Sequence, residues 1–378
     1  MPPARHCIRL WRHTMHDMKD VFSLPPFKTG REEKQAMLRR YLWSLTRQHY
    51  ESCAAYRGIL DAFGVSPDSH EKDCQHVPFL PVSLFKKLEL KSIPQEEVVK
   101  VLTSSGTTGQ TVSRIFLDKY TAINQQKALA ATFTAFTGAS RMPMLILDTP
   151  SVLKDRYMFS ARGAGILGFS LFGTDRTYAL DENMNLDFPA IESFLERHAG
   201  QRILLFGFTF MIWQHVCKAL HEAHRRLDFS RGLLIHGGGW KKLAGEVSDP
   251  AAFRQALNDV CGLSSIHDYY GMVEQTGCIA LECEYGHLHT SIFADIIMRR
   301  PRDLSVCPTG ERGIVQTLSI LPASYPGHSL LTEDEGTLLG EDDCPCGRLG
   351  KYFVIHGRLK NAEIRGCSDT YAATYTRS

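Results

Sequence analysis

The sequence lacks a strong charge of either sign, because 43 Lys and Arg residues stand against 41 Asp and Glu residues, for a formal net charge of +2. Proteins that bind nucleic acid or a membrane surface usually carry a basic patch or tail, so we expect neither partner. No apolar run is long enough for a membrane-spanning helix. Internal repeats of solenoid period and low-complexity tracts are also missing. These absences favour an ordinary soluble globular protein.

A secretory signal is missing too, and the eleven cysteines are an odd number scattered over 378 residues. Secreted disulfide frameworks usually pair an even number, so we expect a reducing compartment, the cytoplasm, with free thiols or metal ligands. Residues 1–30 are interpreted as an N-terminal extension. The basic stretch Met1 to His16 is short and contains no serine, which favours a loose extension or an upstream start over a transit peptide.

The rest of the chain has the pattern of an α/β protein. Apolar residues recur at three- and four-residue steps from Arg31 to Tyr50, which predicts an amphipathic helix. A second helix is expected from Ser52 to Phe63, and the prolines in 77–82 predict an extended crossing. Farther on, strand-like and helical runs alternate, as in α/β folds. The expected strands are Met144–Leu147, Ile203–Gly207 and Gly232–Ile235, and the expected helices centre on 123–136, 188–198 and 213–224.

A loop rich in hydroxyls and glycine, Thr103 to Thr111, stands between two strand-like runs, 98–102 and 113–117. Backbone amides and hydroxyls in such a loop can wrap phosphate oxygens. The loop is not a Walker A motif, because no Lys-Ser or Lys-Thr follows its second glycine. Taken alone, it is more simply a polar surface turn. Its central residues are Ser104, Ser105, Gly106, Thr107, Thr108 and Gly109.

Three further motifs follow in order. Gly237, Gly238 and Gly239 come directly after a buried-type strand and remove side chains where a ligand must approach the backbone closely. Tyr270-Gly271 precedes Glu274, so an aromatic ring, a flexible turn and a carboxylate suited to Mg²⁺ stand together. Asp334 lies in the acidic segment 329–336, which is expected to be a turn whose carboxylate accepts hydrogen bonds from ribose hydroxyls.

Two apolar or glycine-rich segments admit a bland interpretation. Gly163, Gly165 and Gly168 spell G-x-G-x-x-G, but a lone match without a preceding strand is weak, so close helix packing or a pocket wall is preferred over a dinucleotide site. The aromatic runs 206–213 and 163–172 offer surface for an acyl chain. Such runs are more often hydrophobic core.

Taken in order, the loop, the triple glycine, Tyr-Gly-x-x-Glu, the Thr-Glu-Asp segment and Gly357-Arg358 resemble the motif series of adenylate-forming enzymes. The resemblance covers most of the chain. It is nearest to the acyl-protein synthetases of bacterial bioluminescence, the long-chain-fatty-acid–protein ligases, and next to phenylacetate-CoA ligases. The runs 104–111, 234–242 and 357–367 carry it. The fold implied is an adenylation domain over 31–356, with a short C-terminal tail over 357–378 in place of the full lid domain.

The resemblance also implies residue roles and an activity. The enzyme would use ATP and Mg²⁺ to convert a carboxylic acid, in this family a fatty acid, to an acyl-adenylate, chemistry that needs charge neutralisation and alignment. By resemblance, Ser104 to Gly109 bind the ATP phosphates, Gly237 to Gly239 line the nucleotide, Tyr270 with Gly271 stacks on adenine, Glu274 holds Mg²⁺, Asp334 binds ribose, and Arg358 sits at the hinge.

The chain departs from the superfamily pattern in two places. The usual lysine after the phosphate loop is missing, although Arg114 stands nearby. Only about twenty residues follow Arg358, where full-length members carry a lid of roughly a hundred. The resemblance instead implies that Cys367, beside Arg365, accepts the acyl group and passes it to a partner acyl reductase. An acid-CoA or carrier-protein ligase and a non-catalytic partner subunit remain the alternatives.

A cysteine and histidine constellation predicts a metal site. Cys344 and Cys346 share a tight turn, and Cys283 stands upstream with His287 and His289; two such pairs complete a tetrahedral zinc site. Because C-x-C spacing is less diagnostic than C-x₂-C, ordinary buried thiols are the alternative. Both segments are similar to those of phenylacetate-CoA ligases, some of which hold zinc there. This likeness favours structural Zn²⁺ on Cys283, His289, Cys344 and Cys346.

Overall fold

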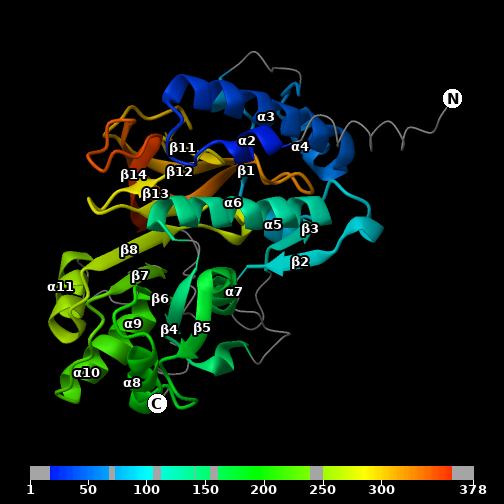
Figure 1. Ribbon diagram of the computed structural model, residues 1–378. Coiled ribbons are helices and arrows are strands. Elements are labelled where there is room, and N and C mark those ends of the chain that lie inside the picture. The colour runs from blue at the N-terminus through cyan, green and yellow to red at the C-terminus, as the bar shows by residue number, and fades with distance from the viewer. Residues whose placement is uncertain are drawn as a thin grey trace.

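The computed structural model of the protein describes residues 18–67, 73–104, 112–139, 141–153, 161–238 and 250–359. Within these ranges a 12-stranded sheet has the order β11-β12-β13-β14-β10-β9-β8-β7-β6-β4-β5, with β1 beside β13. Figure 1 shows two parts, with β4 to β7 and α8 to α11 below and the strands β11 to β14 above. The strand β8 runs from one part toward the other.

The lower part is a parallel sheet covered by helices. Its strands pair in parallel from β5 through β4, β6 and β7 to β8. Every residue of β6 and β7 is buried, as expected for central strands of a sheet covered on both faces. The predicted alternation of strands and helices is confirmed. The strands are β4 Met142–Ile146, β5 Gly173–Tyr178, β6 Ile203–Phe208, β7 Gly232–Gly237 and β8 Ser265–Tyr270, and the helices include α7 Ala161–Phe169, α8 Phe188–Arg197 and α11 Pro250–Cys261.

The helix expected over 213–224 starts earlier and is not uniform. It begins as α9 (Thr209–Ile212), continues as a π-helical segment (Trp213–Cys217) and ends as α10 (Lys218–Glu222). A π segment inserts extra backbone into a helix and often occurs near functional sites. The start at Thr209 brings this helix directly onto the end of β6.

The upper part is antiparallel and was not predicted as strands. β12, β13 and β14 pair with their neighbours in antiparallel register. The expectation that Asp334 lies in a turn is wrong, because it sits inside β13 and pairs with Arg358 of β14. These strands are β9 Ala280–Glu282, β10 Leu288–His289, β11 Ala294–Arg299, β12 Arg312–Ser319, β13 Ser329–Glu341 and β14 Lys351–Arg358.

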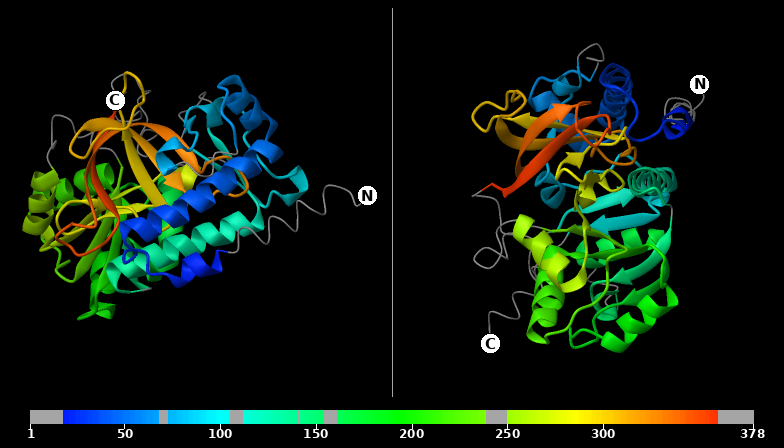
Figure 2. Two further views of the ribbon diagram at one scale, coloured as in Figure 1. Left: turned by 90° about the horizontal axis from the view of Figure 1, so that it is seen from above. Right: turned by 60° about the vertical axis from the view of Figure 1, so that its left-hand side comes forward.

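Long helices pack across the upper part, as Figures 1 and 2 show. α3 buries Leu38, Leu42 and Leu45 on one stripe, which confirms the predicted amphipathic helix. It ends at Ser52, and the extended backbone of Cys53 separates it from α4, so the second helix begins at Ala54 rather than Ser52. These helices are α2 Lys19–Ser23, α3 Arg31–Ser52, α4 Ala54–Ala62 and α6 Lys119–Thr137.

A separate hairpin carries the hydroxyl-rich loop. β2 (Lys100–Thr103) and β3 (Arg114–Leu117) pair in antiparallel register on either side of it, as predicted. The proline-rich crossing before it contributes β1 (Leu80–Pro81), which pairs in parallel with β13, and the short helix α5 (Leu84–Lys87) follows. The 3₁₀ turns are Cys74–His76, Gln95–Glu97, Pro150–Leu153, Ser170–Phe172 and Val273–Gln275.

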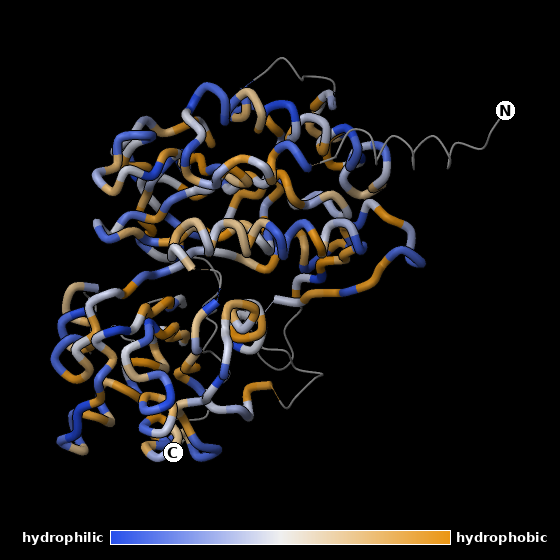
Figure 3. The backbone as a smooth tube through the Cα atoms, in the orientation of Figure 1, coloured by the Kyte–Doolittle hydropathy of each residue, from blue (hydrophilic) through white to orange (hydrophobic). Residues whose placement is uncertain are grey.

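The core beside the parallel sheet is rich in stacked phenylalanines. Phe133 stacks on Phe172 with ring centroids 3.8 Å apart, and Phe169 stacks on Phe206 at 4.4 Å. Figure 3 shows hydrophobic stretches along much of the interior strands. The aromatic runs are therefore largely core, in line with the bland interpretation of them. In the part of the chain described, no helix is both long and apolar enough to cross a membrane.

Candidate functional site

The candidate residues gather where the parallel strands end. β6 ends at Phe208, β7 at Gly237 and β8 at Tyr270, and these strands are neighbours. Ligands of open α/β sheets bind outside the carboxyl ends of the strands. Successive residues of a strand point to opposite faces of the sheet. The side chains of Tyr269 and Tyr270 therefore lie on opposite sides of this edge, which are named after them below.

The Tyr269 side is apolar and built from rings pressed against glycines. A Cβ atom added to Gly237 would lie 2.4 Å from the Tyr269 ring, and one added to Gly165 would lie 2.9 Å from the Phe208 ring. Gly238 has a φ of +101° and would place a Cβ 3.3 Å from Phe208. A Cβ atom would clash with a ring at Gly237 and Gly165, and the positive φ would strain a side chain at Gly238. The interpretation of the glycine-rich segment as close helix packing is confirmed at Gly165 of α7.

The Tyr270 side holds a polar trio drawn from three strands. The Tyr270 hydroxyl donates a hydrogen bond of 2.9 Å to Asp334 Oδ2, and Arg358 Nε lies 3.9 Å from Asp334 Oδ1. Burial raises the pKa of Tyr270 well above its usual value, and the negative charge of Asp334 is the second cause of the rise. The phenol therefore stays protonated and acts as a donor. The structure thus brings together three residues that the sequence analysis assigned to ribose, adenine and hinge.

Glu274 lies near Arg358 and near Ser113, which precedes β3. It is buried on the turn after Tyr270, and burial raises its pKa, while the Ser113 hydroxyl and the cationic groups of Lys86 and Arg358 oppose the rise. Ser113 also links the two flanks of the loop, because its backbone N–H donates a hydrogen bond of 2.9 Å to Ser104 Oγ. Sequence reasoning missed Ser113 and Lys86. Ser113 could have been found from its position, because it stands at the C-terminal end of the loop.

A cavity of about 200 Å³ opens on the other side of β7 from Gly237. His236 pairs in register with Asp268 there, and both line it with Arg254, Glu282 and others. Burial, and then the Glu282 charge, raise the pKa of Asp268 well above its usual value, while burial lowers that of His236 to about 3. Sequence reasoning missed this cavity. The sequence did carry a signal for it: Asp268 stands two residues before Tyr270 in a strand, so both side chains lie on the same face of the sheet.

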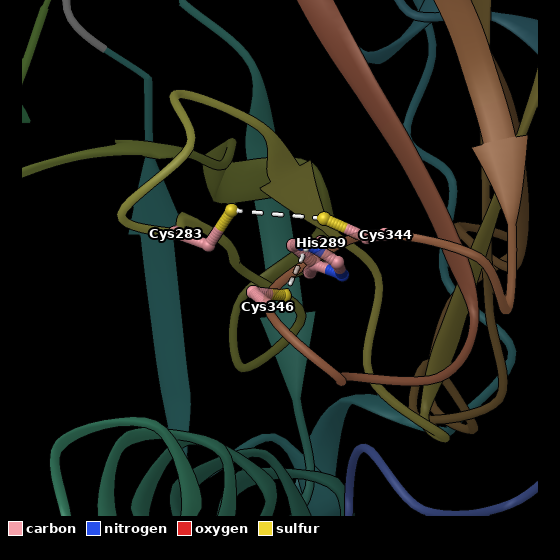
Figure 4. Close-up of side chains that lie close together, drawn as sticks. All are labelled: Cys283, His289, Cys344 and Cys346. Carbon is pink, nitrogen blue, oxygen red and sulfur yellow. Dashed lines mark hydrogen bonds between the residues drawn. The ribbon is translucent and has the colours of Figure 1, made fainter.

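The predicted cysteine and histidine constellation is assembled. Cys283 Sγ lies 3.9 Å from Cys344 Sγ, and Cys346 Sγ lies 3.3 Å from His289 Nε2 (Figure 4). All four ligand atoms lie within 4.8 Å of one another. A tetrahedral zinc with Zn–S bonds of about 2.3 Å separates its sulfur ligands by roughly 3.8 Å. His287 Nδ1 also approaches Cys344 Sγ, at 3.3 Å, from the edge of the cluster.

Cationic and backbone donors surround this cluster. The Arg348 backbone N–H lies 3.5 Å from Cys346 Sγ, and its guanidinium pairs with Glu284 and covers the Phe136 ring. Burial raises the pKa of Cys346, but hydrogen bonds and charge from Arg348 outweigh it and lower the pKa overall. Burial lowers the pKa of His289 to about 4, which keeps the ring neutral near pH 7. A neutral imidazole and a thiol of lowered pKa suit metal binding. Burial raises the pKa of Cys283 and raises that of Cys344 to about 12, so these two thiols would lose their protons only to a bound cation.

Several predicted residues lie outside the described ranges. They are Ser105, Gly106, Thr107, Thr108 and Gly109 of the loop, Gly239 of the triple glycine, and Cys367.

Comparison with known proteins gives a consistent result. A family model described as "Acyl-protein synthetase, LuxE" matches residues 13–376. The long-chain-fatty-acid–luciferin-component ligase of Vibrio harveyi is 25% identical over 366 residues, which cover 94% of this chain and 93% of the relative. The ligase of the same name from Aliivibrio fischeri is 25% identical over 359 residues, covering 92% and 91%.

Solved structures of adenylate-forming ligases share the fold. A 2-hydroxyisobutyryl-CoA ligase in an open conformation, in complex with 2-HIB-AMP and CoA, superposes with a TM-score of 0.66 at 14% identity. The match covers 90% of this chain and 78% of that one. The same ligase in its postadenylation state gives a TM-score of 0.65 at 14% identity, covering 89% and 70%. The predicted fold class is confirmed.

Proposed function

The chain belongs to the acyl-protein synthetase family, and from that premise we propose that it activates a fatty acid with ATP, acylates its own Cys367 and passes the acyl group to a partner reductase. The family is one of ligases. The relatives' printed names support a long-chain fatty acid as the substrate.

The convergence of Tyr270, Asp334, Arg358, Glu274 and Ser113 carries this proposal. These residues come from four separate stretches of chain and meet at the carboxyl edge of the sheet, beside the base of the hydroxyl-rich loop. A nucleoside triphosphate is bound by groups of these kinds. Asp334 is an acceptor for hydroxyls, Glu274 a buried carboxylate and Arg358 a cation, and the hydroxyl-rich loop is of the type that binds phosphate. We assign ribose to Asp334 and the phosphates to the loop, with the base on the Tyr270 and Asp268 side.

The first step is displacement at phosphorus. A carboxylate oxygen of the acid attacks the α-phosphorus of ATP, the bond to the bridging oxygen breaks, and pyrophosphate leaves. Arg358 supplies positive charge near the phosphate, and the Tyr269 and Phe208 side of the edge receives the apolar acyl part. Glu274 fits a Mg²⁺ ligand, because its buried carboxylate has a raised pKa that a nearby cation would relieve. When bound, the ion would neutralise phosphate charge.

The second step moves the acyl group to sulfur. The Cys367 thiolate attacks the carbonyl carbon of the acyl-adenylate, the bond from that carbon to the phosphate oxygen breaks, and AMP leaves with the electron pair. The thiol proton passes to solvent. A thiolate of the partner reductase then attacks the carbonyl carbon of this thioester, the bond from that carbon to the Cys367 sulfur breaks, and Cys367 leaves as a thiolate.

We also propose that Cys283, His289, Cys344 and Cys346 hold a structural Zn²⁺. The ligand set and its spacing suit tetrahedral zinc. The cluster ties the β9–β10 turn to the β13–β14 turn, at the opposite end of β13 and β14 from Asp334 and Arg358. Zinc there would fix the hairpin that carries two of the nucleotide residues.

Carboxylate-dependent exchange of pyrophosphate into ATP tests the proposed function. The protein is offered a panel of fatty, short-chain and aromatic acids with ATP and Mg²⁺, with and without coenzyme A. Exchange with fatty acids, and acyl labelling of the protein without CoA, are the expected results. AMP release that needs CoA would instead indicate an acid-CoA ligase. Exchange with none of the acids would contradict adenylation and favour a non-catalytic subunit.

Replacing Asp334 with asparagine should raise the KM for ATP about tenfold, which corresponds to about 1.4 kcal/mol. The amide oxygen can still accept the Tyr270 hydrogen bond, but the charge facing Arg358 is lost. The KM for the acid should change little. Asp303→Asn, the same charge change beside the exposed Ser305 turn, serves as control. An unchanged KM for ATP in Asp334→Asn would contradict the ribose assignment.

A further inference from the structure

A buried ion pair lies behind the apolar side of the site. Arg162 Nε is 3.0 Å from Asp148 Oδ2, and the side chains expose 10% and 0% of their surface. Asp148 Oδ1 also accepts the Thr149 backbone N–H at 2.7 Å, which fixes the carboxylate at the end of β4. Two charges removed from water are costly to bury unless they hold a defined geometry. None of the roles assigned above uses this pair.

Arg162 joins the first turn of α7 to the segment after β4 and to helix α9. Arg162 stands in the first turn of α7, Asp148 follows β4, and Arg162 Nη1 lies 3.5 Å from the Met211 sulfur on α9, directly after β6. The other end of α7 is held by packing, because Ile166 and Phe169 are buried in the core and Phe169 stacks on Phe206. The ion pair therefore holds the first turn of α7, the end that the core packing does not reach, near the ends of β4 and β6.

The same helix touches the aromatic rings of the site. Gly165 is three residues after Arg162, so both lie on neighbouring positions of one helix face. A Cβ at Gly165 would meet Phe208 Cζ at 2.9 Å and the Tyr269 hydroxyl at 3.4 Å. Those rings in turn press on Gly238 and Gly237. A continuous packed path thus runs from the ion pair, through α7, to the glycine end of β7.

In the proposed function, the acid lies on the ring side of this edge. Tyr270 and Asp268 give their face of β8 a polar character suited to a nucleotide, whereas Tyr269 and Phe208 make the opposite side apolar. An acyl chain joined to the nucleotide through its carboxyl group would lie on the apolar side. Small shifts of these rings therefore change the fit of the acid more than the fit of ATP.

We propose that the Asp148–Arg162 pair is a positioning device that holds α7 so that Gly165 sets the Phe208 and Tyr269 rings, and through them the fit of the acid substrate. This inference rests on the proposed adenylating function. Neither Asp148 nor Arg162 touches the reacting atoms in it. Both residues act through the helix.

Asp148→Asn and Gly165→Ala test it in the full-length protein by ATP–pyrophosphate exchange. Both variants should raise the KM for the fatty acid about tenfold while the KM for ATP stays within about twofold. Gly168→Ala is the matched control, because it adds the same methyl group to α7 where nothing lies within 4 Å. It should behave as wild type. Asp148→Glu, which keeps the charge, should recover part of the affinity.

Equal effects of Gly165→Ala and Gly168→Ala would overturn the proposal, as would equal rises in both KM values. If Asp148→Asn fails to fold, the double variant Asp148→Asn/Arg162→Met, which leaves no buried charge at the pair, carries the test with the same expected split. Wild-type protein that exchanges with no acid would instead overturn the proposed function itself, so the two failures are distinguishable.

Discussion

Replacing Cys367 with serine should abolish stable acyl labelling of the protein, a loss of at least about 100-fold, while ATP–pyrophosphate exchange stays within about twofold of wild type. Exchange needs only the adenylating site, whereas labelling needs a nucleophile to displace AMP. A serine hydroxyl has a much higher pKa than a thiol and is a poor nucleophile without a general base. Labelling is measured with radiolabelled fatty acid on the denatured protein, with release by neutral hydroxylamine as the mark of a thioester.

The other thiols support the choice of Cys367. The structure describes nine cysteines, of which eight are buried and Cys346 is half-buried within the cysteine and histidine cluster. Burial raises the pKa of Cys74, Cys261 and Cys278 to about 12, so they stay protonated and inert. Cys7→Ser is the matched control, since Cys7 is the other cysteine outside the described ranges. Full labelling of Cys367→Ser, or its loss in Cys7→Ser, would contradict the assignment.

The parallel part of the fold was predictable because its strands are apolar throughout. Ile203–Phe208 and Gly232–Gly237 are buried along their whole length, and such runs bounded by helices are typical of a parallel sheet. The antiparallel part was not predicted. β13 mixes buried and half-exposed residues and contains three acidic side chains in a row of four, Glu333 to Gly336, which imitates a solvated turn. Pairing with β12 and β14 overrides that local preference.

The site was predictable as a series of motifs but not as a set of contacts. Tyr270, Asp334 and Arg358 were selected from their order along the chain, yet their contact depends on the β13–β14 register, which the sequence pattern did not give. Asp148 and Arg162 carried no motif at all. Their pairing depends on where α7 crosses the end of β4, a tertiary feature with no periodic signal.

Removing one ligand of the cysteine and histidine cluster should release the metal and destabilise the fold. Binding to the folded state alone stabilises by about 4 kcal/mol at a free metal concentration of about 1,000 Kd, so Cys344→Ser should lose a large part of the stability of a typical domain. Wild-type protein should contain about one zinc per chain by elemental analysis. A strong chelator should lower its Tm but leave that of Cys344→Ser unchanged, because the variant has no metal to lose.

The cluster can be separated from ordinary buried thiols with matched variants. Cys307→Ser changes a buried cysteine elsewhere in the antiparallel part, and it should keep its zinc even if the serine lowers stability. An equal loss of zinc in both serine variants would show that unfolding, and not ligand removal, releases the metal. Wild-type protein without zinc would reject the site.

The two histidines give the sharpest version of this test. His289→Ala should lose zinc, because His289 Nε2 lies with the three sulfurs inside the 4.8 Å cluster. His287→Ala should retain it, because His287 Nδ1 approaches Cys344 Sγ but His287 is not among the four residues whose ligand atoms lie within 4.8 Å of one another. Since the cluster closes the far end of the β13–β14 hairpin, His289→Ala should also raise the KM for ATP through Asp334 and Arg358. Zinc loss in His287→Ala with retention in His289→Ala would reverse the ligand assignment.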